Sequence, residues 1–338
     1  MKKRLDVLLV CDTPYFTPRG YDFSNEFKEL DWETERDIYR ALKQNGHRVT
    51  LLGVHDDVGV LLEEVKENRP DVIFNLTEVF RDRVCLEKNM AWLIEMLGIP
   101  YTGASPTAIL ICNNKALTKE MLNFYQIKVP GFGIFYRTRR RSIPQNYFRL
   151  PVIAKPLCEE ASRGISRASV VDDWSLLAKR IKFIHQKMNM DAIIEEYIEG
   201  RELYVSVIGN KKIRILPARE MRFAKISNGK HRLATYRAKW DSDYRRKWGI
   251  RNSFARGLSE ELNKKIENTC KRAYRALNIQ SYARFDLRIS PDSEVYIIEA
   301  NANPCLARYD EVGASAEKAG ISYNKLIQNL ISLAFQRK

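Results

Sequence analysis

Residues 281–304 read SYARFDLRISPDSEVYIIEANANP and contain the most informative pattern in the chain. The two alternating apolar runs predict consecutive strands joined by a polar turn. Alternation places Arg284 and Asp286 on one face of the first strand, and Glu299 and Asn301 likewise share a face of the second. If these faces coincide, two carboxylates and an amide oxygen form the all-oxygen site that Mg²⁺ prefers. Solvated strand ends are the plainer alternative, but two such pairs on consecutive strands favour the metal site.

Two separated lysines precede these strands. Lys115 opens a predicted helix over 114–125, and Lys155 ends the apolar strand 150–156. An ammonium at the end of an apolar strand is costly to desolvate unless an anion meets it. The following loop, 157–164, has one glycine and is by itself a weak phosphate-binding signal. Because the chain has neither G-x-x-x-x-G-K-[ST] nor G-x-G-x-x-G, P-loop and dinucleotide-binding folds are not indicated.

A third signal is the predicted strand 191–198 and the turn after it. The strand reads Asp-Ala-Ile-Ile-Glu-Glu-Tyr-Ile, and Glu202 follows the turn at Gly200. Such a segment can offer backbone groups to an adenine edge and a carboxylate to ribose hydroxyls. An ordinary strand, turn and strand is the default interpretation of this piece alone.

The other patterns organise the chain into alternating elements. We expect strands at 5–11, 47–53 and 71–76, and helices at 32–45, 58–68, 172–189, 259–277 and 322–335. Strands and helices that alternate over the first hundred residues predict a doubly wound α/β domain. Alternating runs after Gly200 predict antiparallel strands.

Length and composition limit the class of protein. At roughly 100–200 residues per domain, 338 residues predict two or three domains. No run approaches the ~18 apolar residues of a membrane span, and the first residues resemble a buried strand more than a signal peptide. The six cysteines are dispersed without paired spacing, which predicts reduced thiols in a cytoplasmic protein that does not contact membranes.

The positive charge is concentrated. The net charge is +15, and residues 211–256 hold 15 basic and 3 acidic side chains. This segment predicts an anionic partner: nucleotide phosphates, an acidic substrate or a nucleic acid. A basic face that is simply solvated is the alternative. Aromatic residues are interleaved with the charges, but no recognised nucleic-acid module is present, so we do not expect a nucleic-acid partner.

Taken in order, these motifs resemble the ATP-grasp superfamily and, within it, the D-alanine–D-alanine ligase-like group. The landmarks are Ile99-Pro-Tyr-Thr-Gly-Ala104, Asn114-Lys115, Pro151-Val-Ile-Ala-Lys155-Pro, Ile194-Glu-Glu-Tyr-Ile198, Glu202, Arg284-Phe-Asp286 and Glu299-Ala-Asn-Ala-Asn-Pro304. The resemblance covers nearly the whole chain. It implies an α/β ATP-grasp fold of three domains. These are an N-terminal doubly wound domain at 1–105, a central subdomain at 106–192 and a C-terminal subdomain at 193–338.

The resemblance also implies the site residues. ATP-binding positions are Lys115, Lys155, Ser162, Glu195, Glu196, Tyr197, Ile198 and Glu202, with the backbone of Glu196 and Ile198 meeting adenine and Glu202 meeting the ribose. Asp286, Glu299 and Asn301 would hold two Mg²⁺, for which Mn²⁺ can substitute. The implied catalytic residues are Arg284, for the acyl phosphate and tetrahedral intermediate, and Lys239, on a mobile loop. A backbone N–H near Cys305 would assist, and the family pattern suggests a homodimer.

Four positions depart from the D-alanyl ligases, and all of them concern amino-acid recognition. Ala161 replaces the serine of the catalytic hydrogen-bond triad, Trp240 stands at a tyrosine position, and the turn 11–20 lacks the family's glycine pair and glutamate. Asp310 replaces a serine that receives a carboxylate, and Asp310 with Glu311 could instead hold an amine. We therefore predict an ATP-dependent carboxylate–amine ligase that acts through an acyl phosphate on small-molecule or peptide substrates other than D-alanine, with an anionic substrate suggested by segment 211–256.

Three alternatives stay open. The chain is a D-alanine–D-alanine ligase proper, an ATP-grasp kinase that phosphorylates a small molecule, or a non-enzymatic protein whose basic surface binds nucleic acid. The lysines, arginine and acids of the site are all present, which argues against an inactive relative.

Overall fold

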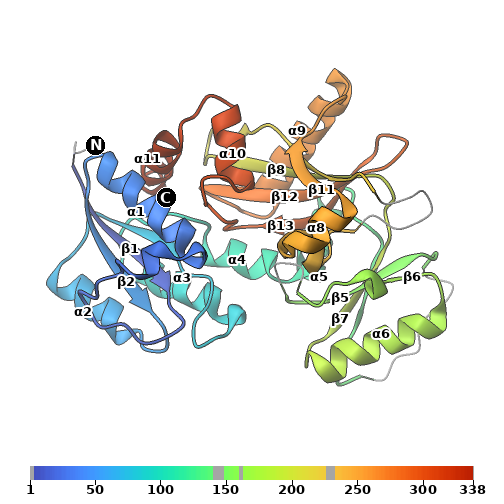
Figure 1. The fold of residues 1–338 in the computed structure, drawn as a ribbon, viewed down its shortest axis with the longest axis horizontal. Helices are drawn as coiled ribbons and strands as arrows, with labels where there is room; N and C mark the ends of the chain where they lie inside the picture. Colours follow the sequence, from blue (N-terminus) through green and yellow to red (C-terminus); the bar gives the residue numbers. More distant parts are fainter. Residues whose placement is uncertain (1–3, 140–147, 160–162, 226–232, 338) are drawn as a thin grey trace.

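The structure is a computed structural model that describes residues 4–139, 148–159, 163–225 and 233–337 (Figure 1). These described residues form three sheets, each accompanied by helices. No helix among the described residues is both long enough and apolar enough to cross a membrane.

The N-terminal sheet is parallel, with strand order β2-β1-β3. Its elements are β1 (Asp6–Asp12), α1 (Glu33–Gln44), β2 (Arg48–Val54), α2 (Gly59–Glu67), β3 (Val72–Leu76) and α3 (Glu87–Met96). Apolar side chains cover both faces of β1, as its continuous apolar sequence predicts. Gly46, just after α1, has φ of +86°, a left-handed conformation that ends the helix at low cost.

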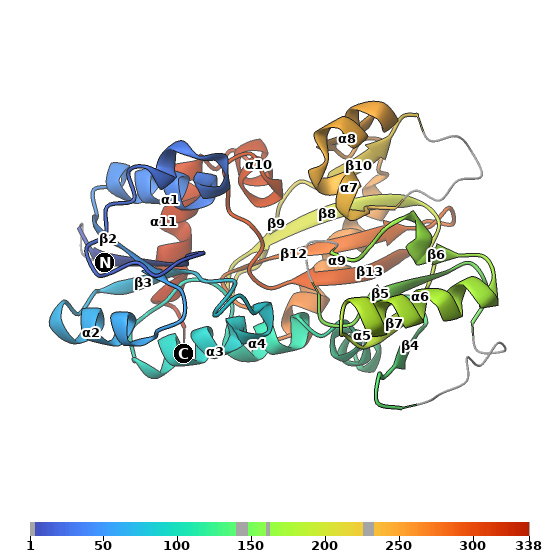
Figure 2. The same ribbon diagram turned by 60° about the horizontal axis from the view of Figure 1, so that its bottom comes forward.

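The last helix of the chain packs on this first sheet. Helix α11 (Tyr323–Ala334) contacts α1 and β3, and both views show it beside α1 (Figures 1 and 2). Leu330 and Ile331 of α11 lie in one apolar cluster with Ile38 and Leu42 of α1. The two ends of the sequence therefore share a hydrophobic core.

The central sheet is antiparallel, with order β4-β7-β5-β6. Its strands are β4 (Phe132–Phe135), β5 (Val152–Pro156), β6 (Val170–Val171) and β7 (Ala192–Glu196), and helix α6 (Trp174–Lys187) covers one face (Figure 2). Helices α4 (Pro106–Cys112) and α5 (Lys115–Phe124) precede the sheet in the chain. Asp173 caps α6 and Asn114 caps α5, as their side-chain oxygens accept hydrogen bonds from first-turn amides.

The third sheet is also antiparallel, with order β11-β10-β8-β12-β13 and β9 beside β8. Its elements are β8 (Arg201–Ile208), β9 (Arg214–Ile215), β10 (Arg219–Phe223), α7 (Tyr236–Trp240), α8 (Ser242–Trp248), β11 (Ile250–Phe254), α9 (Glu260–Ala276), β12 (Tyr282–Ile289), β13 (Val295–Asn301) and α10 (Glu311–Lys318). Cys270 and Tyr274 of α9 pack against Phe285 and its neighbours on one face of the sheet. The other face carries the polar residues described below.

One local expectation was wrong. Residues 236–240 were expected on a mobile loop, but they form helix α7. The Thr235 hydroxyl accepts a hydrogen bond from the Ala238 amide, and Ala238 is buried against Tyr204 and Met221. A cap and one apolar contact therefore stabilise a helix in a segment that the family resemblance placed on a loop.

The shared core of the chain ends gives a stability prediction. We expect Leu330→Ala to lower the free energy of unfolding by about 2–5 kcal/mol, because a fully buried leucine is replaced by a cavity. Leu30→Ala, at a leucine that is 83% exposed, is the matched control and should change little. Urea unfolding of both variants measures the difference. Equal stabilities would contradict the packing of α11 against α1.

Candidate functional site

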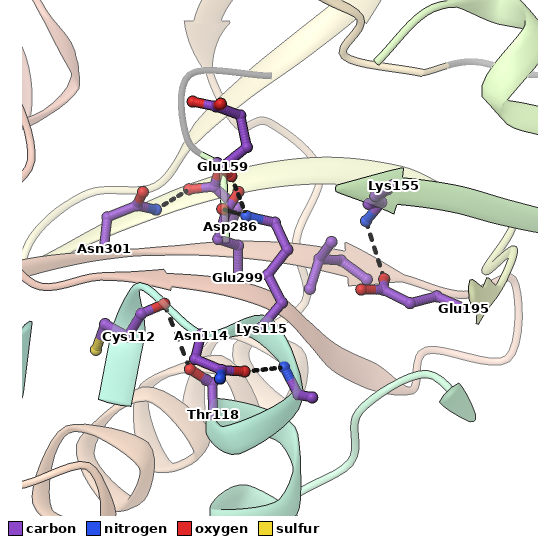
Figure 3. A network of polar contacts seen from close by, with 12 residues as sticks. Cys112, Asn114, Lys115, Thr118, Lys155, Glu159, Glu195, Asp286, Glu299 and Asn301 are labelled. Atoms are coloured by element: carbon purple, nitrogen blue, oxygen red, sulfur yellow. Dashed lines mark hydrogen bonds and ion pairs between the residues drawn. The ribbon is translucent and has the colours of Figure 1, made fainter. Parts of the chain in front are cut away.

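The site is built on the pairing of β12 with β13. In this antiparallel pair Arg284 lies opposite Asn301 and Asp286 lies opposite Glu299, so the four side chains share one face, as the sequence predicted. Asn301 Nδ2 donates to Asp286 Oδ1 at 3.3 Å (Figure 3). The register shifts between Asp286 and Leu287, directly after the acidic pair.

Three cations contact these acids. Lys115 Nζ lies 2.7 Å from Glu299 Oε1 and also donates to the Glu159 carbonyl (Figure 3). Arg284 Nε donates to Asp286 Oδ1 at 2.8 Å, and Lys239 Nζ lies 3.7 Å from Asp286 Oδ2. Burial opposes ionisation of Glu299, but Lys115 and Lys239 hold the pKa of its carboxyl at about 2. The two strands thus carry carboxyl groups that lie directly beside lysine and arginine side chains.

The donor set fits Mg²⁺. Mg²⁺ is usually held by one or two carboxylates and completes its shell with water and phosphate oxygens. Asp286 and Glu299 supply two carboxylates and Asn301 supplies an amide oxygen on the same face. In the described parts of the chain no cluster of three or more acidic, histidine or cysteine side chains is arranged around a metal position. The remaining coordination positions would therefore fall to a phosphate-bearing ligand and water.

A second charged group lies behind this face. Lys155 Nζ, at the end of β5, donates to Glu195 Oε2 of β7 at 2.9 Å (Figure 3). Lys119 Nζ lies 3.1 Å from the other oxygen, Glu195 Oε1, and donates to the Ile298 carbonyl at 2.7 Å. Lys119 and Glu195 are each 1% exposed. Burial raises the pKa of Glu195, but the two lysines together bring it below its usual value.

Lys119 is a residue that sequence reasoning missed. It stands one helical turn after Lys115 on α5, so both lysines lie on the same side of the helix. Burial lowers the pKa of Lys119, whereas Glu195 opposes that shift. The spacing of four residues was the available signal, but only the fold shows that Lys119 is fully buried.

A small cavity of about 50 Å³ separates the central sheet from the third sheet. It is lined by Lys155, Glu195, Glu196 and Ile198 from one side and by Glu202, Asp286, Arg288 and Glu299 from the other, among further residues. The predicted ATP-binding residues from both sheets therefore converge. Glu202 is also engaged by its own neighbours, since Arg288 Nη2 and the Tyr204 hydroxyl both donate to it.

Lys115 and Tyr197, two of the expected ATP-binding residues, are not among the described residues that line this cavity. Tyr197 is absent from its lining; the Tyr197 amide donates to the Pro151 carbonyl, and its ring lies beneath the Arg288 guanidinium. Ser162, like Ala161, lies outside the described residues. The amide of Glu196 donates to the Gly131 carbonyl at 2.8 Å, so this N–H is already used within the protein.

A larger cavity of about 230 Å³ adjoins the β12–β13 face. Arg284, Asn301, Lys239, Trp240, Cys305, Asp310 and Glu311 line it, together with Arg245 and others. The expected catalytic and substrate residues therefore meet in one space. Trp240, at the end of α7, is 60% exposed, and burial raises the pKa of the Cys305 thiol to about 12.

Asp310 and Glu311 carry opposite pKa shifts. Asp310 caps α10 by accepting a hydrogen bond from the Glu311 amide, and Asn252 Nδ2 donates to Glu311 Oε1 at 2.8 Å. Burial and the neighbouring Asp310 raise the pKa of Glu311. Burial opposes ionisation of Asp310, but hydrogen bonds from Glu311 and the Arg284 charge bring its pKa below the usual value. One of the two acids therefore ionises more readily than the other.

Few basic side chains of segment 211–256 line this cavity. Lys239 and Arg245 line it, whereas Arg246 is largely exposed and pairs with Asp243. Lys247 lies beside the Trp248 ring. Residues 226–232 lie outside the described residues. Of the described basic residues of the segment, only Lys239 and Arg245 thus line this cavity.

Known proteins show clear similarity to this chain. A family model described as D-ala D-ala ligase C-terminus matches residues 123–332, more than half of the chain. An uncharacterized protein y4sG of Sinorhizobium fredii is 28% identical over 307 residues, which are 89% of this chain and 87% of that protein. A D-alanine–D-alanine ligase of Pseudothermotoga lettingae is 28% identical over 309 residues, which are 91% of this chain and 95% of that protein.

Solved structures agree on the fold. The D-alanine–D-alanine ligase of Bacillus anthracis complexed with ATP has a TM-score of 0.74 at 19% identity and covers 99% of this chain and 98% of its own. The corresponding enzyme of Coxiella burnetii has a TM-score of 0.72 at 18% identity and covers 99% of this chain and 95% of its own. The expected α/β ATP-grasp fold is confirmed.

The buried charges predict a role for Lys119 in ATP binding. We expect Lys119→Met to weaken ATP binding about tenfold or more, because Glu195 keeps only Lys155 and holds that lysine away from phosphate. The same change should lower the free energy of unfolding by about 1–3 kcal/mol, because the Ile298 carbonyl and Glu195 Oε1 each lose a buried donor. Titration calorimetry with ATP and urea unfolding measure the two effects.

Two further variants make this test specific. Lys128→Met removes a lysine that is 56% exposed and should bind ATP normally. Lys119→Met combined with Glu195→Gln should be less stable than Lys119→Met alone, because the Lys155 ammonium then also loses its carboxylate partner. Normal ATP affinity in Lys119→Met would show that this lysine does not position Lys155.

Proposed function

Because the chain belongs to the D-alanine–D-alanine ligase family, whose members are ATP- and Mg²⁺-dependent ligases that form C–N bonds, we propose that it joins a carboxylate to an amine through an acyl phosphate. The observation that carries this proposal is the convergence of Lys115, Lys239 and Arg284 on Asp286 and Glu299 beside a cavity. The products are an amide, ADP and phosphate.

The position of each residue in the site indicates its proposed role. Lys115 and Lys155 come from two different elements and would contact the phosphates of ATP. Lys115 would then exchange Glu299 for a phosphate oxygen, and Lys155 would exchange Glu195 for one. Asp286, Glu299 and Asn301 would hold Mg²⁺, which supplies positive charge to the transferring phosphoryl group. Lys239 reaches the same face from α7 and offsets negative charge from the cavity side.

The reaction has two balanced steps. A substrate carboxylate oxygen attacks the γ-phosphorus, the bond to the β-phosphate oxygen breaks, and ADP leaves. The amine nitrogen then attacks the acyl carbon, loses a proton, and phosphate departs as the C–N bond forms. Arg284 lines the cavity beside Asn301, so its guanidinium can stabilise the negative oxygen of the tetrahedral intermediate. The surrounding residues hold the reacting groups close together in the correct orientation, which makes both steps effectively unimolecular.

We propose that the substrate pair differs from two D-alanines. Trp240 and Asp310 line the cavity at positions where the family carries a tyrosine and a carboxylate-binding serine. An aspartate there repels a carboxylate and attracts an amine. D-Alanine–D-alanine ligation is the second candidate, and it is equally consistent with the similarity to curated D-alanine–D-alanine ligases.

A hydroxylamine trap tests the acyl phosphate. The protein is incubated with Mg-ATP, hydroxylamine as a general amine, and pools of amino acids, peptides and di- or tricarboxylates; ADP and hydroxamates are then scored by mass spectrometry. We expect ADP together with one hydroxamate, which also identifies the carboxylate substrate. A D-alanine hydroxamate would favour the second candidate. ADP with a stable phosphorylated product and no hydroxamate would identify a kinase, and absence of ADP in every pool would contradict the ligase proposal.

Charge-neutral variants test the metal-holding face. We expect Glu299→Gln and Asp286→Asn to lower ADP formation about 100-fold or more, because each removes a carboxylate of the Mg²⁺ site. Glu294→Gln, one residue before β13, is the matched control; Glu294 pairs with Lys128 and Lys265 outside the site. Equal rates for Glu299→Gln and Glu294→Gln would show that Glu299 holds no metal.

A further inference from the structure

A second large cavity, of about 540 Å³, opens beside the catalytic one. It lies between the N-terminal sheet and the segment after β13, and it shares lining residues with the catalytic cavity. The shared residues are Glu78, Trp240, Asn303, Pro304 and Cys305. A substrate whose reacting group lies at Arg284 can therefore extend into this second space.

The charges of this cavity are of one sign. Its acidic lining residues are Asp12, Glu29, Asp31, Glu35 and Glu78. They come from the end of β1, the turns before α1, the first turn of α1 and the loop after β3. No lysine, arginine or histidine of the described chain lines it. Five carboxylates from separate segments thus face a space without a cation of the protein's own.

Three of these acids are not engaged in ion pairs elsewhere. In the described structure Glu29, Asp31 and Glu35 make no salt bridge with a lysine or arginine, in contrast to Glu299 and Glu195 of the ATP site. Burial, together with the nearby Asp12 charge, raises the pKa of Glu35 to about 7. A bound cation would favour the ionised form of Glu35 and would therefore lower its pKa again.

A buried tyrosine at the same cavity has no hydrogen-bond partner among the described residues. Tyr282 of β12 lines the cavity and is 2% exposed as a residue, and no hydrogen bond joins its hydroxyl to another described residue. The hydroxyl of a tyrosine buried to this extent normally has a partner. Unlike the acids, this group is neutral, so it marks a polar ligand atom independently of the charge pattern.

The occupant is better explained as an organic cation than as a metal ion. No group of three or more metal-binding side chains is gathered in the described part of the chain. The acids are instead spread around a space large enough for several non-hydrogen atoms, and Trp32 and Trp240 add aromatic faces to it. Ammonium and guanidinium groups suit carboxylates and aromatic faces together.

We propose that this cavity binds an ammonium or guanidinium group at the end of a ligase substrate remote from the reacting atoms. The substrate is then a basic amino acid or a polyamine. This inference rests on the proposed ligase function and names its substrate class. The charge of the cavity is opposite to the anionic substrate that the basic segment 211–256 suggested.

Titration calorimetry on the full chain tests the proposal. The cationic probes are L-lysine, 1,4-diaminobutane and spermidine, and D-alanine and L-glutamate are the neutral and anionic comparisons. We expect at least one cationic probe to bind about tenfold or more tightly than both comparisons and to weaken as salt increases. Preference for L-lysine over the diamines would identify an amino acid, and the reverse would identify a polyamine.

Variants locate the binding. We expect Glu35→Gln and Glu29→Gln each to weaken the preferred cation about three- to tenfold, because each removes one charge from the cavity. Glu29 is exposed, so its substitution keeps the fold even if Glu35→Gln destabilises it. Glu63→Gln on α2, at an exposed glutamate outside the cavity, is the control and should bind the cation normally.

The outcomes separate this inference from the ligase proposal. Cationic probes that bind no better than D-alanine, or that bind Glu29→Gln and Glu35→Gln as tightly as the unmodified chain, would overturn the inference. Hydroxamate formation from neutral or anionic carboxylates with no gain from cationic partners would also overturn it, while the ligase function stands. Selective cation binding without ADP formation in any substrate pool would support the cavity assignment and contradict the ligase.

Discussion

The pairing register of β12 with β13 is the constraint on which the site depends. It sets Asp286 opposite Glu299 and Arg284 opposite Asn301, so that three oxygen-bearing side chains and one guanidinium share a face. A shift of one residue in either strand would send half of them into the apolar core under α9. The buried faces of both strands, with Phe285 and Ile297 in that core, hold the register in place.

Charge balance is the second constraint. Lys115, Lys119 and Lys155 are all nearly buried, and each contacts a glutamate: Lys115 contacts the partly exposed Glu299, and the other two contact the buried Glu195. Isolated buried ammonium groups are costly to desolvate, so the glutamates offset the charge of these lysines. The same pairs can then exchange a glutamate for phosphate at little electrostatic cost. In the acidic cavity beside the N-terminal sheet, Glu29, Asp31 and Glu35 have no such lysine or arginine partner among the described residues, and this difference underlies the proposed cation.

The three sheets are joined in a way that places these charges together. Helix α5 brings Lys115 and Lys119 to the edge of the third sheet, where Lys119 donates to the Ile298 carbonyl of β13. Strands β5 and β7 present Lys155 and Glu195 from the central sheet. Helix α11 returns the end of the chain to α1, so the N-terminal sheet stays beside the segment that follows β13. The site therefore draws on every part of the chain.

Local patterns in the sequence predicted most elements and the shared face of Asp286, Glu299 and Asn301. Alternation in β12 and β13, the caps at Asn114 and Asp173, and the periodicity of α1, α6, α9 and α11 depend on neighbours within a few residues, so they can be recognised without the fold. Helix α7, the burial of Lys119 and the second cavity could not, because each depends on contacts between residues far apart in the chain. The sequence alone suggested an anionic substrate from the sum of basic residues in 211–256. Only the tertiary structure shows which charged residues line the two larger cavities, because net charge carries no direction and side-chain position does.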